Sequence, residues 1–333
     1  MQSAVIGGGS WGTALATVLA EKGPVRLWAR SAEVVQGINA DHQNPRYQTE
    51  LKLPENLSAS GELSEVLAGA ELVCVVVPSH AMRAVMSAAA PHVPAGVPIV
   101  SASKGIENST LQTMEEVLGE VLPRGYRGDL AFLSGPSFAR ETIQRMATAV
   151  TVAARFHDVA VATQRAFNTS FFRVYTTEDV TGVELGGALK NVIAIAAGVA
   201  DGMGLGHNSR AALLTRGLAE VSRLAVKRGA NPLTLAGLAG MGDLVLTCTG
   251  GLSRNRHVGI QLGKGRTLGE ILGEMSEVAE GVRTAQSAHQ LAQKEGVDMP
   301  VTREVYRILY EDKPPAIALA DLMGRGARRE RDE

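Results

Sequence analysis

The first half of the chain alternates short apolar segments with amphipathic helical segments, and this alternation constrains the fold more than any other feature. It is typical of a parallel sheet whose strands are joined by crossover helices. The segment from Leu72 to Val77 is continuously apolar and rich in valine, as expected for a strand covered on both faces. We predict strands at Ser3–Ile6, Val25–Trp28, Glu71–Val77, Val97–Ser101, Leu130–Leu133, Ala149–Ala153 and Phe172–Tyr175, with helices beginning near Ser10, Ser31, Leu63, Ala81, Leu111, Ser137 and Val159.

After about Val180 the strand-like segments stop and only helical patterns follow. We predict glycine-rich loops at G-M-G-L-G and A-G-L-A-G-M-G-D between some of these helices. The expected organisation is a sheet domain over residues 1–180, an all-α domain over 181–325, and a charged tail over 326–333. The predicted helices are Val183–Ala200, Ser209–Arg228, Asn255–Lys264, Thr267–Met275, Val282–Glu295 and Val301–Tyr310.

Composition excludes several classes of protein. The net charge of -1 provides no general electrostatic reason to expect nucleic-acid binding. No uninterrupted apolar segment fits a membrane span, and the first predicted strand leaves no room for a cleavable signal. Cys74 lies in an apolar segment, and Cys248 has no cysteine or histidine nearby at metal spacing. We therefore expect a cytoplasmic protein with neither a disulfide framework nor a metal site.

A glycine-rich turn connects the first predicted strand to the first predicted helix. Gly7, Gly9 and Gly12 form the pattern G-x-G-x-x-G. In dinucleotide-binding sites the first glycine permits a tight turn, the second lets pyrophosphate approach the backbone, and the third lets helix and strand pack closely. The amides at the helix N-terminus then meet the phosphates. The sequence therefore predicts a Rossmann-like α/β domain; a glycine-rich turn in an unrelated α/β protein is the alternative.

The end of the second predicted strand bears on which dinucleotide binds. Sites that prefer NAD usually hold the ribose 2′-hydroxyl with an acidic residue at this point, whereas here Arg30 occupies it. A guanidinium favours a 2′-phosphate, so we expect NADP(H) to be preferred, with NAD(H) possible. A surface arginine would give the same pattern. Glu33 is the rival for a ribose contact, but it better suits the first turn of a helix.

Lys190 lies within a segment that otherwise has the pattern of a buried helix, Val183–Ala200. It shares a face with mostly small residues, among them Gly186 and Gly187, so another group can approach the backbone there. Two glycines cost a helix about 1 kcal/mol each relative to alanine, which suggests a packing or binding reason; we expect them to leave room for cofactor or substrate beside the lysine. Lys190 either extends its ammonium to water along an apolar surface, or is desolvated near a substrate and handles a proton.

Other polar residues follow predicted strands or lie in loops of the helical half, where this architecture places its cleft. Lysine, serine, arginine and asparagine together suit a small phosphorylated or carboxylated molecule. Taken singly, Lys104 could be a solvated loop lysine, and Asp243 or Ser253 a helix cap. The candidates are Lys104, the segment Ser134-Gly135-Pro136-Ser137, Asp243, and the segment Ser253-Arg254-Asn255.

Five segments in this order resemble the bacterial glycerol-3-phosphate dehydrogenases, the soluble NAD(P)-dependent family. They are G-G-G-S-W-G-T-A-L-A, S-K-G-I-E, S-G-P-S-F-A, G-A-L-K-N-V-I-A-I-A-A-G and L-S-R-N-R, and the resemblance covers residue 3 to about residue 281. It implies reversible reduction of dihydroxyacetone phosphate to sn-glycerol 3-phosphate for phospholipid synthesis, and a homodimer. The protein supplies orientation and a proton, since the cofactor carries the hydride.

The resemblance also implies roles for individual residues. Lys190 looks like the catalytic proton donor and acceptor, and Lys104 like a second lysine that orients the substrate carbonyl. Thr247, one helical turn after Asp243, is a further candidate for substrate contact. The implied substrate contacts are Lys104, Gly135, Ser137, Lys190, Asp243, Ser253, Arg254 and Asn255. The implied cofactor contacts, beside the three glycines, are Ser10, Trp11, Arg30, Lys104, Ala139, Arg254, Val278 and Glu280.

Two other functions stay open at this point. One is a related two-domain NADPH-dependent reductase of a ketoacid, of the ketopantoate type. The other is a non-catalytic sensor of NADP(H) that keeps the fold. Lysines at both position 104 and position 190 argue against a sensor, because a sensor does not need paired proton-handling groups.

Overall fold

The computed structural model describes residues 1–47, 49–275, 279–326 and 329–330. Its first part is one eight-stranded sheet in the order β3-β2-β1-β4-β5-β6-β7-β8. Strands β1 to β6 run parallel, β7 is antiparallel to β6, and β8 is parallel to β7. The strands are β1 Ser3–Ile6, β2 Val25–Trp28, β3 Leu57–Ser60, β4 Leu72–Val75, β5 Ile99–Ser101, β6 Leu130–Ser134, β7 Thr148–Ala154 and β8 Phe172–Thr177.

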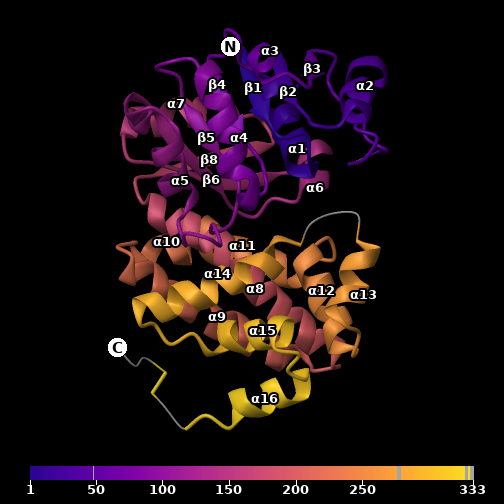
Figure 1. Ribbon diagram of the computed structural model, residues 1–333, viewed down its shortest axis with the longest axis vertical. Helices are drawn as coiled ribbons and strands as arrows, with labels where there is room; N and C mark the ends of the chain where they lie inside the picture. The colour runs from indigo at the N-terminus through magenta and orange to yellow at the C-terminus, as the bar shows by residue number, and fades with distance from the viewer. Residues whose placement is uncertain (48, 276–278, 327–328, 331–333) are drawn as a thin grey trace.

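Helices connect these strands and cover the sheet (Figure 1). A separate apolar cluster lies on each of its two faces, which explains why β1 and β4 are buried along their whole length. The connecting helices are α1 Ser10–Ala20, α2 Ala32–Asp41, α3 Leu63–Leu67, α4 Met82–Ala89, α5 Met114–Val121, α6 Ala139–Ile143 and α7 His157–Phe167, with short 3-10 turns η1 Ser79–Ala81, η2 Ala90–His92 and η3 Arg124–Asp129.

Strand β3 was not predicted. Its sequence, L-S-A-S, has two serines and only four residues, and it pairs on one side only, with β2. Leu57 and Ala59 face the core while Ser58 is exposed. An edge strand this short has too little apolar sequence to be recognised, and its register is fixed by the neighbouring strand.

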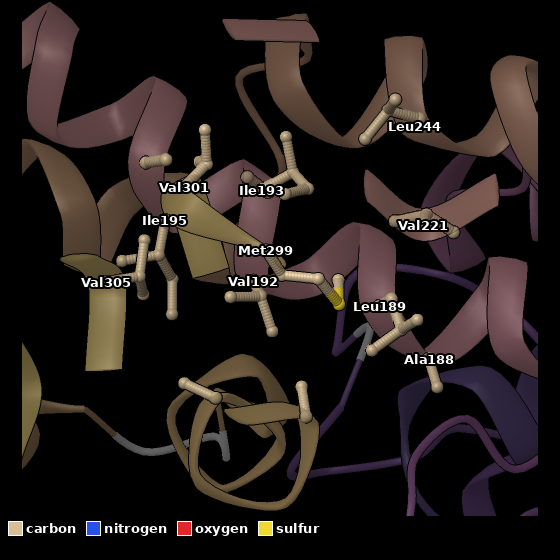
Figure 2. Close-up of a cluster of buried hydrophobic side chains, with 14 of the residues drawn as sticks. Ala188, Leu189, Val192, Ile193, Ile195, Val221, Leu244, Met299, Val301 and Val305 are labelled. Carbon is tan, nitrogen blue, oxygen red and sulfur yellow. The ribbon is translucent and has the colours of Figure 1, made fainter. Parts of the chain in front are cut away.

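The described residues after β8 are mostly helical and pack against one edge of the sheet domain (Figure 1). Helix α8 forms its centre, and branched side chains of α8 pack with those of α9, α11 and α15 in one apolar cluster (Figure 2). The helices are α8 Val180–Gly202, α9 His207–Lys227, α10 Pro232–Ala236, α11 Asp243–Thr249, α12 Arg254–Gly263, α13 Leu268–Glu274, α14 Glu280–Glu295, α15 Pro300–Tyr310 and α16 Pro315–Met323.

The predicted loop A-G-L-A-G-M-G-D is wrong. Leu238–Gly242 form a π-helical turn, η4, that leads directly into α11. A side chain at Gly240 would lie 2.0 Å from the carbonyl oxygen of Leu235, so only glycine allows the chain to coil this tightly. The glycines that suggested a loop instead permit a compact helical turn, and this turn fixes where Asp243 begins α11.

Helices α8 and α12 cross closely at glycines on both sides. A Cβ at Gly198 would lie 2.1 Å from the oxygen of Arg256, and one at Gly259 would lie 2.1 Å from the oxygen of Ile195. Gly202 and Gly263 repeat the same contact one turn further along. Without side chains between them, the two backbones touch, and α12 is fixed relative to α8.

Helix α8 is also the one described helix long and apolar enough to cross a membrane. However, 94% of its most apolar window is buried inside the protein. Its apolar composition is therefore that of a core helix.

Candidate active site

The carboxyl ends of the parallel strands and the helical domain enclose a cleft of about 660 Å³. Residues far apart in the sequence meet there, from the α1 N-terminus, the segments after β4, β5 and β6, and helices α8, α11, α12 and α14. Of the predicted site residues, Gly9, Ser10, Trp11, Gly12, Lys104, Ser137, Ala139, Lys190, Asp243, Thr247, Ser253, Arg254, Asn255 and Glu280 line this cleft.

Two lysines share one buried carboxylate at the bottom of the cleft. Lys104 donates to Oδ2 of Asp243 at 2.6 Å, and Lys190 donates to Oδ1 of the same residue. Lys190 also donates to the hydroxyl of Thr247 at 2.9 Å. Lys190 is only 7% exposed and Asp243 only 1%. The interpretation of Lys190 as a residue that extends to water is therefore wrong.

The three charges shift one another's protonation. Burial lowers the pKa of Lys190 to about 8, the carboxylate of Asp243 partly opposes this, and the ammonium of Lys104 adds to it. Burial alone would raise the pKa of Asp243, but the two ammonium groups outweigh it and hold this pKa below its usual value. Lys190 can therefore exist in either protonation state near neutral pH, with an ionised carboxylate beside it.

The two glycines beside Lys190 do not leave room for a ligand. A Cβ at Gly187 would lie 2.5 Å from the hydroxyl oxygen of Ser134 and 3.7 Å from Cδ of Lys104. One at Gly186 would lie 2.7 Å from the carbonyl oxygen of Ala239. Protein atoms fill the space, so these glycines let the end of β6 and the η4 turn approach α8.

The glycine-rich turn has the shape that a dinucleotide requires. Gly7 has a φ of +128° and an added Cβ there would meet the oxygen of Val76 at 2.3 Å, so the turn is tight. At Gly12 a Cβ would lie 1.8 Å from the oxygen of Gly7, whereas at Gly9 nothing lies within 4 Å. The backbone is thus open to the cleft only at the second glycine, at the N-terminus of α1. The buried indole nitrogen of Trp11 has no hydrogen-bond partner.

The N-terminus of α12 supplies the polar residues on the helical side. Ser253 caps this helix, since its hydroxyl accepts from the amide of Arg256 at 3.2 Å. Ser253 is therefore a helix cap, one of the two roles expected for it, and it also lines the cleft. Oδ1 of Asn255 accepts from the amide of Gly281 at 2.9 Å, which ties α12 to the start of α14 beside Glu280.

Three predicted residues lie outside the lining of the cleft. Gly7 is buried within the glycine-rich turn and does not line the cleft. Arg30, after β2, is exposed and does not line the cleft either. Gly135, with a φ of +149°, contributes its carbonyl, which accepts from Lys104 at 3.4 Å. Val278 is outside the described residues. Glu33, the rival for the ribose, pairs instead with Arg46 at 2.9 Å in the first turn of α2.

Several cleft residues were not predicted. Asn191 follows the catalytic candidate directly and is buried in the wall, so its position next to Lys190 was the available signal. Apolar side chains such as Phe138 and Leu252 carry no chemical pattern that distinguishes them from core residues. The other unpredicted residues of the wall are Tyr47, Val76, Val77, Pro78, Ala102, Ser103, Arg140, Leu246, Glu274 and Met275.

A Rossmann-like sheet domain, an all-α domain and a cleft between them with paired lysines define a dinucleotide-dependent oxidoreductase. Residues 2–160 match the family described as NAD-dependent glycerol-3-phosphate dehydrogenase N-terminus, and residues 179–320 match its C-terminus. The chain belongs to the NAD-dependent glycerol-3-phosphate dehydrogenase family.

Individual relatives agree with this family. The chain is 57% identical to a glycerol-3-phosphate dehydrogenase [NAD(P)+] of Myxococcus xanthus over 331 residues, which cover 99% of each chain. It is 56% identical to that of an Anaeromyxobacter species over 99% of this chain and 100% of the relative. A crystal structure of glycerol-3-phosphate dehydrogenase from Coxiella burnetii superimposes with a TM-score of 0.92 at 40% identity, covering 97% of this chain and 99% of that one.

Ketopantoate reductases share only the fold. One from Ralstonia eutropha superimposes with a TM-score of 0.63 at 17% identity.

Proposed function

We propose that Lys190, Lys104 and Asp243 form the catalytic centre of a glycerol-3-phosphate dehydrogenase in this cleft. As a member of its family, the chain is an NAD(P)-dependent oxidoreductase that reversibly reduces dihydroxyacetone phosphate to sn-glycerol 3-phosphate. The single observation that carries the residue assignment is the pair of lysines on one buried carboxylate, inside the cleft that the glycine turn also enters.

The chain's own groups handle the proton and the developing charge. The nicotinamide cofactor supplies or accepts the hydride when it is bound. Lys190, with its pKa lowered to about 8, gives a proton to the substrate oxygen during reduction and takes it back during oxidation. Lys104 provides a second positive charge where negative charge develops on that oxygen. Asp243 and Thr247 hold the Lys190 ammonium in place through the hydrogen bonds described above.

The remaining assignments concern binding. Arg254 and Asn255, at the start of α12, are proposed to bind the substrate phosphate, with Gly135, Ser137, Thr247 and Ser253 as further substrate contacts. The open backbone at Gly9 suits the cofactor pyrophosphate, since nothing occupies the space beside it. The other proposed cofactor contacts are Gly7, Ser10, Trp11, Gly12, Arg30, Lys104, Ala139, Arg254, Val278 and Glu280.

The substrate is tested first: purified wild-type protein should oxidise NADPH with dihydroxyacetone phosphate and not with ketopantoate.

Replacement of Lys190 tests the catalytic centre. Lys190→Ala should abolish turnover while NADPH still binds, which separates the loss of the proton donor from a loss of cofactor affinity. Lys294→Ala, at an exposed lysine of α14, is the matched control and should turn over normally. Normal turnover by Lys190→Ala would mean that another group handles the proton.

We also propose that NADP(H) is preferred over NAD(H), because Arg30 follows β2 where NAD-preferring sites have an acidic residue. Steady-state kinetics of the wild-type protein with NADPH and NADH decide this point. Equal kcat/KM values for the two cofactors would contradict it.

The proposed reaction uses no metal ion. In the described part of the chain, no three His, Cys, Asp or Glu side chains gather to hold one.

The assembly is proposed to be a homodimer. Helix α16 exposes Ile317 (52%) and Met323 (78%), and it borders an apolar cavity of about 1110 Å³ against α9 and α15. Exposed apolar surface of this kind is typical of an interface. Light scattering should give twice the chain mass of 35.0 kDa, and Met323→Glu should lower it. A monomeric wild-type protein would exclude the dimer.

We further propose that the protein is cytoplasmic and that its domains follow the change from strands to helices. We place the sheet domain at 1–180, the helical domain at 181–325 and the charged tail at 326–333; β8 ends at Thr177 and α8 begins at Val180. Cys74 and Cys248 are both buried free thiols, which suits the reducing cytoplasm.

A further inference from the structure

Three basic side chains lie just outside the cleft, at the end where β2 and β4 stop. Arg30 follows β2, His80 lies in η1 after β4, and Arg283 lies in the first turn of α14. Pro78, two residues before His80, and Glu280, three residues before Arg283, both line the cleft. Arg30 comes two residues after the end of β2. Two of these residues belong to the sheet half of the molecule and one belongs to the helical half.

Contacts between the two halves bring these residues together. Strands β2 and β4 flank β1, so their parallel carboxyl ends meet at one edge of the sheet. A Cβ at Gly105 would lie 2.4 Å from the hydroxyl of Ser79 and 3.9 Å from that of Thr284. Ser79 and Thr284 adjoin His80 and Arg283 in the sequence, so η1 and α14 are close neighbours here.

These three basic side chains form no ion pair within the described part of the chain. In the described ranges no carboxylate pairs with Arg30 or Arg283, although Arg46 pairs with Glu33 and Arg83 with Glu107. Partial burial and then the guanidinium groups of Arg283 and Arg30 lower the pKa of His80, so both guanidinium groups act on the same imidazole. Like charges held together without a counter-ion favour binding of an anion.

We propose that Arg283 of the helical half joins Arg30 and His80 to bind the 2′-phosphate of NADP(H) across the cleft. This deepens the proposed function and rests on its assumption that the cleft binds a dinucleotide. The site suits a phosphate monoester because it lies at the end of β2, where this architecture holds the adenosine ribose that carries the 2′-phosphate. Guanidinium groups bind such a dianion through paired N–H donors. NAD(H) has a neutral hydroxyl at that position, which offers Arg283 no negative charge to pair with.

Binding measurements test the role of Arg283 without turnover. Dissociation constants for NADPH and NADH, and for adenosine 2′,5′-bisphosphate and adenosine 5′-monophosphate, are measured on the wild-type protein and on Arg283→Gln. The variant should bind NADPH and the bisphosphate about tenfold more weakly, which corresponds to about 1.4 kcal/mol. Its affinity for NADH and the monophosphate should be unchanged. Arg283→Lys keeps the charge and should recover part of the lost affinity.

Lys294→Gln is the matched control, because it removes one positive charge from an exposed position at the other end of α14. It should leave all four constants unchanged. If Arg283→Gln weakens the binding of NADPH and NADH equally, or weakens the binding of neither, the inference is wrong. This holds even if Arg30→Gln weakens the binding of NADPH alone. Failure of the proposed function is a separate result: wild-type protein would then reduce no dihydroxyacetone phosphate with either cofactor.

Discussion

At the scale of single residues, the chemistry depends on one carboxylate that serves two lysines. Asp243 accepts from Lys104 and Lys190 while being almost fully buried. A buried charge is costly unless it is paired and hydrogen-bonded, and here each of the three groups stabilises another. The centre carries one net positive charge, since two ammonium groups face one carboxylate, and it therefore suits an anionic substrate.

The pH dependence of turnover should follow Lys190. Reduction needs its ammonium form, so kcat/KM for dihydroxyacetone phosphate should fall as pH rises through about 8, the value to which burial lowers this pKa. Oxidation of glycerol 3-phosphate needs the neutral amine, so its kcat/KM should rise through the same range. Profiles measured in both directions check this. Two profiles that change in the same direction would contradict the assignment of one shared acid and base.

Asp243→Asn should affect both turnover and pH dependence. Without the carboxylate, the repulsion between Lys104 and Lys190 is unopposed, so the pKa of Lys190 should fall further and the profile should move to lower pH. Loss of a preorganised charge partner should lower kcat by roughly 10²- to 10³-fold. Turnover and the pH profile of the variant are compared with wild type. A wild-type profile in the variant would show that Asp243 does not set the protonation of Lys190.

Much of this centre could be predicted from residue types and motifs, but the contacts could not. The motifs located Lys104, Lys190 and Asp243, whereas only the folded chain shows that they form one group. The glycines beside Lys190 were misinterpreted for the same reason. Their pattern shows that something approaches the helix backbone, and it does not distinguish a ligand from Ser134 or Ala239 of the protein itself.

At the scale of elements, the close crossing of α8 and α12 positions the site. Helix α8 carries Lys190, and the N-terminus of α12 carries Ser253, Arg254 and Asn255. The crossing fixes the distance between the proton donor and the residues proposed to bind phosphate. Arg256 reinforces it by donating to Asp201 at the end of α8 at 2.8 Å.

Gly259→Ala should therefore damage stability and activity together. The added methyl would meet the backbone oxygen of Ile195 at 2.1 Å, and a backbone atom cannot move aside as a side chain can. Overpacking of this kind costs about 1–3 kcal/mol, and α12 must shift. Gly269→Ala in α13 is the control, because nothing lies within 4 Å of its Cβ position. Urea denaturation measures both variants, and equal stabilities would mean that the crossing tolerates a side chain.

Elements with a strong apolar pattern were predicted well, and those without one were not. The buried strand β4 and helix α8 have long apolar segments, so their existence follows from the sequence. Strand β3 is held by its neighbour, and the η4 turn is held by packing against α8, since Ala239 touches Gly186. Such elements form because of tertiary contacts, and the local sequence alone does not reveal those contacts.

At the scale of the whole molecule, a carboxyl group lies between the two halves. Glu184 of α8 accepts from the amide of Glu115 at the start of α5, at 2.9 Å. Burial raises its pKa to about 8; hydrogen bonding from Thr113 partly opposes this. The folded state then keeps a proton that the unfolded chain releases.

Stability should therefore fall as pH rises from about 5 to 8, because the unfolded state binds fewer protons over this range. Glu184→Gln stays neutral and keeps an oxygen for the same amide, so its stability should depend less on pH. The exposed Glu62 provides the control variant, Glu62→Gln, which should follow the wild-type curve. Thermal unfolding between pH 5 and 8 makes the comparison. Parallel curves for wild type and Glu184→Gln would contradict the prediction.

Helix α8 has a mechanical consequence for the whole enzyme. Its first turn packs with the sheet, through Val180 and Val183, and the rest of it packs within the helical cluster. It therefore belongs to both halves, with Lys190 near its middle. A rotation of one half against the other about α8 would displace the rim of the cleft most and Lys190 least.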